Sequence, residues 1–168
     1  MRKLLFVLVA VMSMSLSLFG CGKKDAKLEK YYEEMNSFAD EVLSLKESMD
    51  SIDLNSESAY TEMLTYLDGM EEQFRILADM EVPKQFSSNE VLGDEAYSYM
   101  QEAVRLYNEY YNSAENDTNV FDAAGENYSR AMKRIEYISM ILKGEIPEGE
   151  GIEVFNEEQT DFNPVTEE

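Results

Sequence analysis

Residues 28–52 read LEKYYEEMNSFADEVLSLKESMDSI, and this stretch decides the fold. Every seventh residue is apolar in two registers that lie three residues apart, with acidic residues and lysines between them. This spacing gathers the apolar side chains on one face of an α-helix and predicts packing against other helices, as in a helical bundle. The two sets are Leu28, Met35, Val42 and Met49, and Tyr31, Phe38, Leu45 and Ile52.

Three further segments repeat this spacing, and short turn-rich breaks separate them. Asn55 or Ser56 can cap the start of the second segment. Ser87, with Glu90 three residues later, has the sequence of a capping box at the start of the third. Gly144 follows the fourth, at the position where a left-handed residue often ends a helix. We therefore expect four helices, at about residues 26–52, 56–80, 88–113 and 119–143.

The apolar sets of these segments define the expected core. Tyr60 opens the set of the second segment and Phe121 that of the fourth, so both rings are expected to face the core. Gly69 lies inside the second segment, where glycine costs a helix about 1 kcal/mol relative to alanine. Short connections favour antiparallel neighbours. The sequence thus predicts an all-α fold, with residues 26–143 forming an antiparallel up-down-up-down four-helix bundle.

Residues 144–168 lack this periodicity. From residue 145 onward they hold nine acidic residues and no basic one. Such a segment buries too little apolar surface to offset the entropy of ordering, so we expect a disordered acidic tail. Its apolar residues leave an alternative open, which is docking on the bundle or on a partner. These residues are Ile152, Val154, Phe155 and Phe162.

Residues 1–20 have the character of a targeting segment. Arg2 and Lys3 precede an uncharged stretch that runs to Phe19 and is shorter than the roughly 20 residues of a spanning helix. The residues Leu18-Phe19-Gly20-Cys21 then resemble the lipobox of bacterial lipoproteins. Leu18 and Gly20 match the aliphatic and small positions of that motif, whereas Phe19 stands where a small residue is usual.

The resemblance implies that a signal peptidase recognises Leu18, Phe19 and Gly20 and removes residues 1–20, which would form an N-terminal signal helix. Cys21 would then carry a diacylglyceryl lipid (palmitate-type acyl chains), with residues 21–25 as a short linker. It places the protein at the cell membrane, lipid-anchored on the extracytoplasmic face. In a four-helix arrangement, loops 53–56 and 115–118 would point away from the membrane and loop 81–87 toward it. An ordinary secretory signal and an uncleaved N-terminal helix are the alternatives.

Composition excludes several classes of function. The formal net charge of -21 opposes nucleic-acid binding, which needs clustered Lys and Arg. A single cysteine forms no internal disulfide, and the absence of His removes the usual ligands of zinc and of di-iron bundle sites. No cofactor and no metal is expected. A loose resemblance to calcium loops in Asp50, Asp53, Asn55 and Glu57 is better explained by capping and turn chemistry.

No residue pattern indicates catalysis. A hydrolase without His needs a Ser–Lys pair or paired carboxylates. The adjacent pairs Glu33–Glu34 and Glu71–Glu72 lie between apolar heptad positions, which is typical of solvated helix faces. We therefore expect a protein that is not an enzyme.

Tyrosines of the third segment form the candidate contact surface, because they are spread too broadly to be buried on one face. We expect a non-enzymatic helical interaction module with a protein partner in the cell envelope, held at the membrane by the lipid on Cys21. The alternative is a lipoprotein that binds a small ligand such as a peptide, a cation or a glycan fragment, and self-association is possible. The surface comprises Tyr97, Tyr99, Tyr107, Tyr110 and Tyr111.

Overall fold

The computed structural model describes residues 25–115 and 117–147. This part of the chain is entirely helical, without a strand, so the predicted all-α class is confirmed for it. The lipobox residues Leu18, Phe19, Gly20 and Cys21 lie outside the described residues, as does the acidic tail from residue 148. The elements are α2 (Ala26–Asp50), α3 (Ala59–Ala78), the short 3-10 helix η1 (Lys84–Phe86), α4 (Ser88–Asn112) and α5 (Thr118–Leu142).

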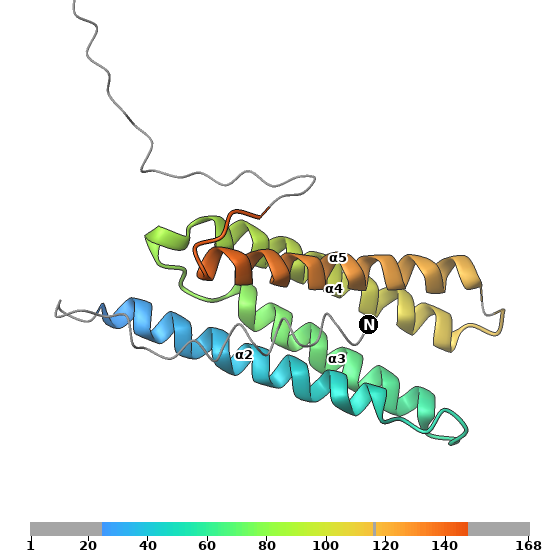
Figure 1. Ribbon diagram of the computed structural model, residues 1–168. Helices are drawn as coiled ribbons and strands as arrows, with labels where there is room; N and C mark the ends of the chain where they lie inside the picture. Colours follow the sequence, from blue (N-terminus) through green and yellow to red (C-terminus); the bar gives the residue numbers. More distant parts are fainter. Residues whose placement is uncertain (1–24, 116, 148–168) are drawn as a thin grey trace, which may run out of the picture.

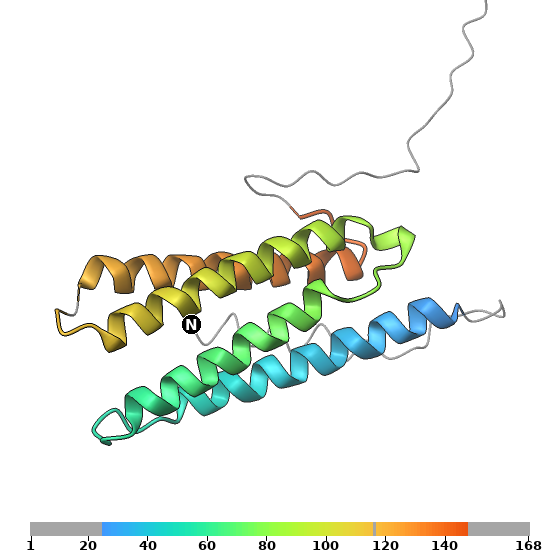
Figure 2. The same ribbon diagram turned by 180° about the vertical axis from the view of Figure 1, so that it is seen from behind.

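Successive long helices run in opposite directions, as Figures 1 and 2 show from two sides. The most extensive contact joins α4 to α5, followed by the contacts of α3 with α4 and of α2 with α3. Helices α2 and α5 do not pack extensively along their lengths. Each helix therefore packs mainly on its neighbours in sequence, and α2 is the helix with the least extensive packing.

The loop between α2 and α3 is longer than the sequence predicts, because a local turn replaces the expected helix ends. Helix α2 ends at Asp50 rather than Ile52. The Asp53 carboxylate accepts hydrogen bonds from the backbone N–H and the side-chain amide of Asn55, each at 3.0 Å. The backbone N–H of Ser56 donates to the Asp53 carbonyl at 2.9 Å. These bonds hold the chain in a turn, so α3 starts three residues later than predicted.

Two of the expected helix caps are wrong and one is confirmed. Neither Asn55 nor Ser56 caps α3, which begins after Ser58. The Ser87 side chain makes no capping hydrogen bond, because the chain enters α4 directly from η1 and Ser87 is already in a helical conformation. Gly144 does follow α5 with a φ of 77°, in the left-handed region that favours glycine.

The core follows the apolar spacing of the sequence in most places. Phe38 of α2 and Phe74 of α3 meet edge to face at its centre, with ring centroids 5.6 Å apart. Gly69 lets α2 and α3 approach closely there, since a Cβ at that position would lie 2.9 Å from Leu45 Cδ2. The largest fully buried side chains are Tyr31, Phe38, Phe74, Met35, Leu67, Met70, Met100, Ile135, Ile138 and Val42.

Tyr60 and Phe121 depart from the expected core. Tyr60 is 65% exposed and Phe121 is 39% exposed. Both belong to the first turn of their helix, next to a loop at the end of the helical unit. Their apolar heptad positions therefore predict the helix face on which each ring lies, but they do not predict that the ring is buried.

The opposite end of the helical unit is closed by buried aromatic and polar contacts. Phe86 of η1 packs against Tyr31 and Tyr32 of α2, with ring centroids 6.0 Å apart in each pair. The Asn89 side-chain amide in the first turn of α4 donates to the Tyr31 hydroxyl at 3.1 Å. Asn89 is only 2% exposed. We call Tyr31, Tyr32, Phe86 and Asn89 the closed end.

Candidate functional site

Aromatic rings from three helices gather at the end of the molecule opposite the closed end. Tyr60 of α3 lies against Tyr111 of α4, with ring centroids 5.2 Å apart. Phe121 of α5 contacts Tyr110 at 5.0 Å and Tyr107 at 5.5 Å. Tyr110 and Tyr111 also meet edge to face at 5.2 Å. We call these five residues the aromatic tip: Tyr60, Tyr107, Tyr110, Tyr111 and Phe121.

The aromatic tip is partly open to solvent. Tyr60 and Phe121 are exposed, whereas the three tyrosines of α4 are half-buried. Leu54, in the neighbouring loop between α2 and α3, is 76% exposed. Half of the exposed large apolar side chains of the described residues thus lie at this end, where Leu54, Tyr60 and Phe121 are found. Aromatic residues in such a position are typical of the anchor residues of protein interfaces.

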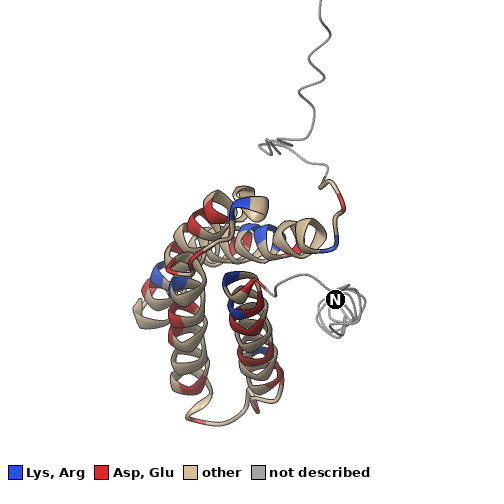
Figure 3. Cartoon of the chain, turned by 90° about the vertical axis from the view of Figure 1, so that its left-hand side faces the viewer, with Lys and Arg blue, Asp and Glu red and all other residues tan. Residues whose placement is uncertain are grey.

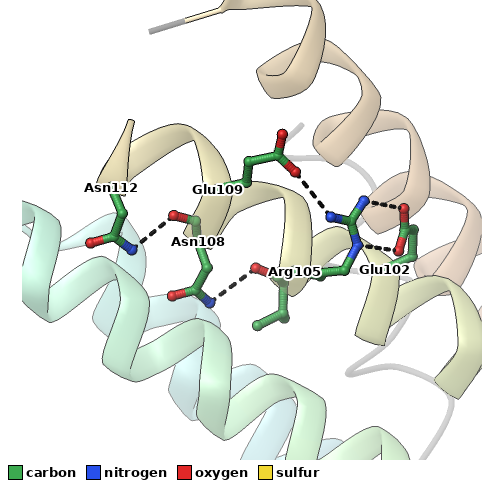
Figure 4. Close-up of polar contacts among 6 residues, drawn as sticks. Glu102, Arg105, Asn108, Glu109 and Asn112 are labelled. Carbon is green, nitrogen blue, oxygen red and sulfur yellow. Dashed lines mark hydrogen bonds and ion pairs between the residues drawn. The ribbon is translucent and has the colours of Figure 1, made fainter. Parts of the chain in front are cut away.

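The sequence of α4 explains why its three tyrosines lie together. Tyr107, Tyr110 and Tyr111 are spaced by three and four residues, so they share one side of the last two turns. On the same turns, the Asn108 amide donates to the Val104 carbonyl at 3.0 Å, and the Asn112 amide donates to the Asn108 carbonyl at 2.8 Å (Figure 4). These polar side chains bond to their own helix.

The start of α5 brings Phe121 to these tyrosines. The Asp117 carboxylate accepts a hydrogen bond from the backbone N–H of Asn119 at 2.9 Å and so caps the helix. Phe121 then follows within the first turn. The tip is therefore assembled from two helix starts and one helix end.

Burial raises the pKa of two tyrosines of the tip and of Tyr128, which lies beneath them. Desolvation by burial raises the pKa of Tyr107 and of Tyr111, and neighbouring tyrosines of the tip add a smaller contribution to each. Burial likewise raises the pKa of Tyr128 to about 12, and Tyr107 and Asp50 add to this shift. Tyr128 lies two turns after Phe121 on α5 and is more buried than Phe121.

The structure divides the predicted tyrosine surface. Tyr107, Tyr110 and Tyr111 belong to the tip, but Tyr97 and Tyr99 lie further along α4. The Tyr97 hydroxyl accepts a hydrogen bond from the Gln101 amide at 3.1 Å. The ring of Tyr99 faces the guanidinium groups of two arginines of α5, at 5.8 Å from Arg130 and 5.4 Å from Arg134.

Sequence reasoning missed two residues of the tip. Tyr60 and Phe121 occupy apolar heptad positions, so their spacing alone predicts burial. The available signal was their place in the chain, since each follows a turn-rich break by only a few residues.

The residues that loosely resemble a calcium loop take part in local structure. The backbone N–H of Asn55, followed by its side-chain amide, lowers the pKa of the Asp53 carboxyl. Asp50 forms an ion pair with Lys46 one turn earlier in α2. Among residues 25–115 and 117–147, no group of three or more Asp, Glu, His or Cys side chains is placed to hold a metal ion.

The adjacent carboxylates lie on exposed or half-buried helix faces, and three of the four pair with nearby side chains. Glu34 forms an ion pair with Lys30 at 3.0 Å, and Glu72 forms one with Arg75 at 2.6 Å. Glu71 accepts a hydrogen bond from Gln101 at 3.4 Å. These pairs are intrahelical or bridge α3 to α4.

The chain matches no protein-family model, no curated protein and no solved structure. Within the two ranges that the structure describes, none of the helices is both long enough and apolar enough to cross a membrane.

Proposed function

We propose that this protein is a lipid-anchored lipoprotein of the extracytoplasmic face whose helical module is not an enzyme and contacts a protein partner of the cell envelope through the aromatic tip. The observation that carries the proposal is the gathering of five aromatic rings, two of them exposed, at one end of the module. Exposed apolar patches on a soluble domain mark interaction sites. Aromatic side chains also supply much of the binding energy in protein interfaces.

The lipobox-like residues at positions 18–21 support the anchor, and the arrangement of the helices supports the orientation. We infer that the four helices act as one up-down-up-down bundle. Helix α2 begins at Ala26, five residues after Cys21. A helix of 25 residues is about 37 Å long at 1.5 Å per residue. The aromatic tip would therefore stand about 37 Å further from the membrane than the start of α2.

A photo-crosslinking amino acid placed at the tip tests the contact. We expect Tyr60 replaced by benzoylphenylalanine to yield a crosslinked protein in intact cells. Val91 is the matched control, because it is 61% exposed and lies in the first turn of α4 at the other end. Equal crosslinking from both positions, or none from Tyr60, would contradict the proposed contact.

The anchor is tested separately with Cys21→Ala. We expect this variant to lose palmitate labelling and to leave the membrane fraction, because a lipid with two acyl chains is the only membrane attachment that the proposal contains. A Gly22→Ala variant should keep both properties. If Cys21→Ala stayed in the membrane fraction as fully as the parent chain, or if the parent chain itself took up no palmitate, the anchor would be wrong.

A further inference from the structure

The surroundings of the aromatic tip are strongly acidic. Residues 51–62 and 109–122 form the two loops at this end with the adjoining helix turns, and they contain seven acidic residues and no basic one. All seven side chains belong to exposed residues. Figure 3 shows that acidic residues are also spread over the other parts of the helices, so the tip differs in lacking cations rather than in having anions. We call these seven residues the acidic rim: Asp53, Glu57, Glu62, Glu109, Glu115, Asp117 and Asp122.

The basic side chains that precede these two stretches in the sequence are already engaged. Lys46 pairs with Asp50. Arg105 forms ion pairs with Glu102 at 2.7 Å and Glu109 at 2.9 Å on the same helix (Figure 4). In the described part of the chain, the six residues of the acidic rim other than Glu109 form no ion pair. The rim of the tip thus keeps a local excess of negative charge.

The other half of the molecule shows how this chain places cations on tyrosine rings. Along α5, Arg130 and Arg134 lie over Tyr99, and the Lys133 ammonium lies 5.0 Å from the centroid of Tyr137. A cation over an aromatic face is attracted by the negative charge of the ring face. No Lys or Arg of the described residues lies over a ring of the tip.

We propose that the aromatic tip recognises a cationic partner surface, whose Arg or Lys side chains lie over the tyrosine rings while the acidic rim surrounds them. This inference rests on the proposed function and adds the chemistry of the partner. Charge also decides against a second copy of this chain as the occupant, because two tips would bring their acidic rims together. An anionic polymer or membrane surface is disfavoured for the same reason.

Binding of short labelled peptides to the full-length chain tests the inference. Hexa-arginine is the probe, hexaglutamate is its negative control, and fluorescence anisotropy is the measurement. We expect hexa-arginine to bind and hexaglutamate not to bind. Raising the salt concentration from about 0.05 M to about 0.5 M should weaken the binding at least severalfold, since exposed charges are screened.

Two sets of variants locate the binding. Replacing Glu57 and Glu62 by Gln and Asp122 by Asn removes three charges from the rim, and we expect about tenfold weaker binding. The matched control removes three exposed charges from α2 by Glu33→Gln, Asp40→Asn and Glu41→Gln, and should change the affinity less than about twofold. Both sets change the net charge by the same amount.

The rings are tested with Tyr60→Leu combined with Tyr111→Leu. This pair keeps apolar surface but removes the aromatic faces, and we expect about fivefold weaker binding or more. The matched pair Tyr60→Phe and Tyr111→Phe keeps the faces and should bind nearly as well as the parent chain. Circular dichroism establishes that each variant retains the helical fold.

Several outcomes would overturn the inference. The first is equal binding of hexa-arginine and hexaglutamate. The second is an equal loss of affinity for hexa-arginine in the rim variant and in its α2 control, which would show that only the net charge of the chain matters. The third is a concentration-dependent dimer in sedimentation that the Leu pair abolishes, which would identify a second copy as the occupant. If the tip position crosslinks in cells but the chain shows no preference for hexa-arginine over hexaglutamate, this inference alone is overturned. Preference for hexa-arginine without any crosslink would instead overturn the proposed function.

Discussion

The two ends of the helical unit use aromatic rings in opposite ways. At the closed end, Tyr31 is 1% exposed, its hydroxyl receives a hydrogen bond from Asn89, and Phe86 covers its ring. At the aromatic tip, Tyr60 occupies an equivalent apolar heptad position and is mostly exposed. The comparison teaches that the spacing of apolar residues determines the face on which a ring lies. Whether the ring is covered depends on what packs against it from other segments, which the spacing within one segment does not specify.

The largest expected effect separates the two ends directly. Tyr31→Ala should lower the free energy of unfolding by about 3–5 kcal/mol, because it empties a fully buried aromatic site and leaves Asn89 without its partner. Tyr60→Ala should change it by less than about 1 kcal/mol, because that ring is mostly in water. Urea unfolding followed by circular dichroism measures both. Equal losses would show that the tip is as much a part of the core as the closed end.

A smaller effect tests whether water that reaches the aromatic tip also reaches Tyr128, which lies deeper in α5. The quantity measured is the free energy of unfolding as a function of pH. The neutral phenol is the favoured form of Tyr128 in the folded state, since burial raises its pKa to about 12. The unfolded value is near 10, so its contribution to stability is full below about pH 10 and is lost as the pH rises toward 12. We expect a loss of about 2 kcal/mol across that window that Tyr128→Phe removes.

Urea unfolding of the parent chain and of Tyr128→Phe across that pH window gives the measurement. The other tyrosines with raised pKa are present in both proteins, so the difference between the two curves reports Tyr128. Parallel curves would mean that water reaches Tyr128 and that the tip is open to that depth.

The smallest effect probes the packing near the closed end. Gly93 is buried in α4, and an added Cβ would make ordinary contacts, 3.6 Å from the Leu77 carbonyl oxygen. Gly93→Ala should therefore stabilise the protein by about 0.5–1 kcal/mol through helix propensity. Gly69→Ala should gain less, because its Cβ displaces the Leu45 side chain. A loss of stability in Gly93→Ala would show that α3 and α4 meet more tightly than their geometry indicates.

The sequence predicts the helices and most of the core because both depend on local periodicity. Each of the four expected helices is present, and residues such as Tyr31, Phe38 and Phe74 are buried as their spacing indicates. The ends between α2 and α3 were not predictable in the same way. They depend on hydrogen bonds of the Asp53 turn, which compete with further helical turns.

The candidate site was predictable in part. Tyr107, Tyr110 and Tyr111 share one helix, so their spacing alone brings them together. Tyr99 precedes Tyr107 by eight residues, which is about 12 Å along a helix, and it therefore meets α5 at another level. Tyr60 and Phe121 join the tip from other helices, and no spacing within one segment indicates such a meeting. The lipid anchor at Cys21 stays a prediction from the sequence.

The placement of Ala26 and the aromatic tip at opposite ends has a mechanical consequence. If the proposed anchor holds the start of α2 and the proposed partner holds the tip, a pulling force between them would act parallel to the helix axes. Such a force loads the contact between α2 and α3 in shear, so that many side-chain contacts must yield together rather than one after another. The resistance of the module to this load is then set by its rate of forced unfolding. Helix α2, with its less extensive packing, would be the element that yields first.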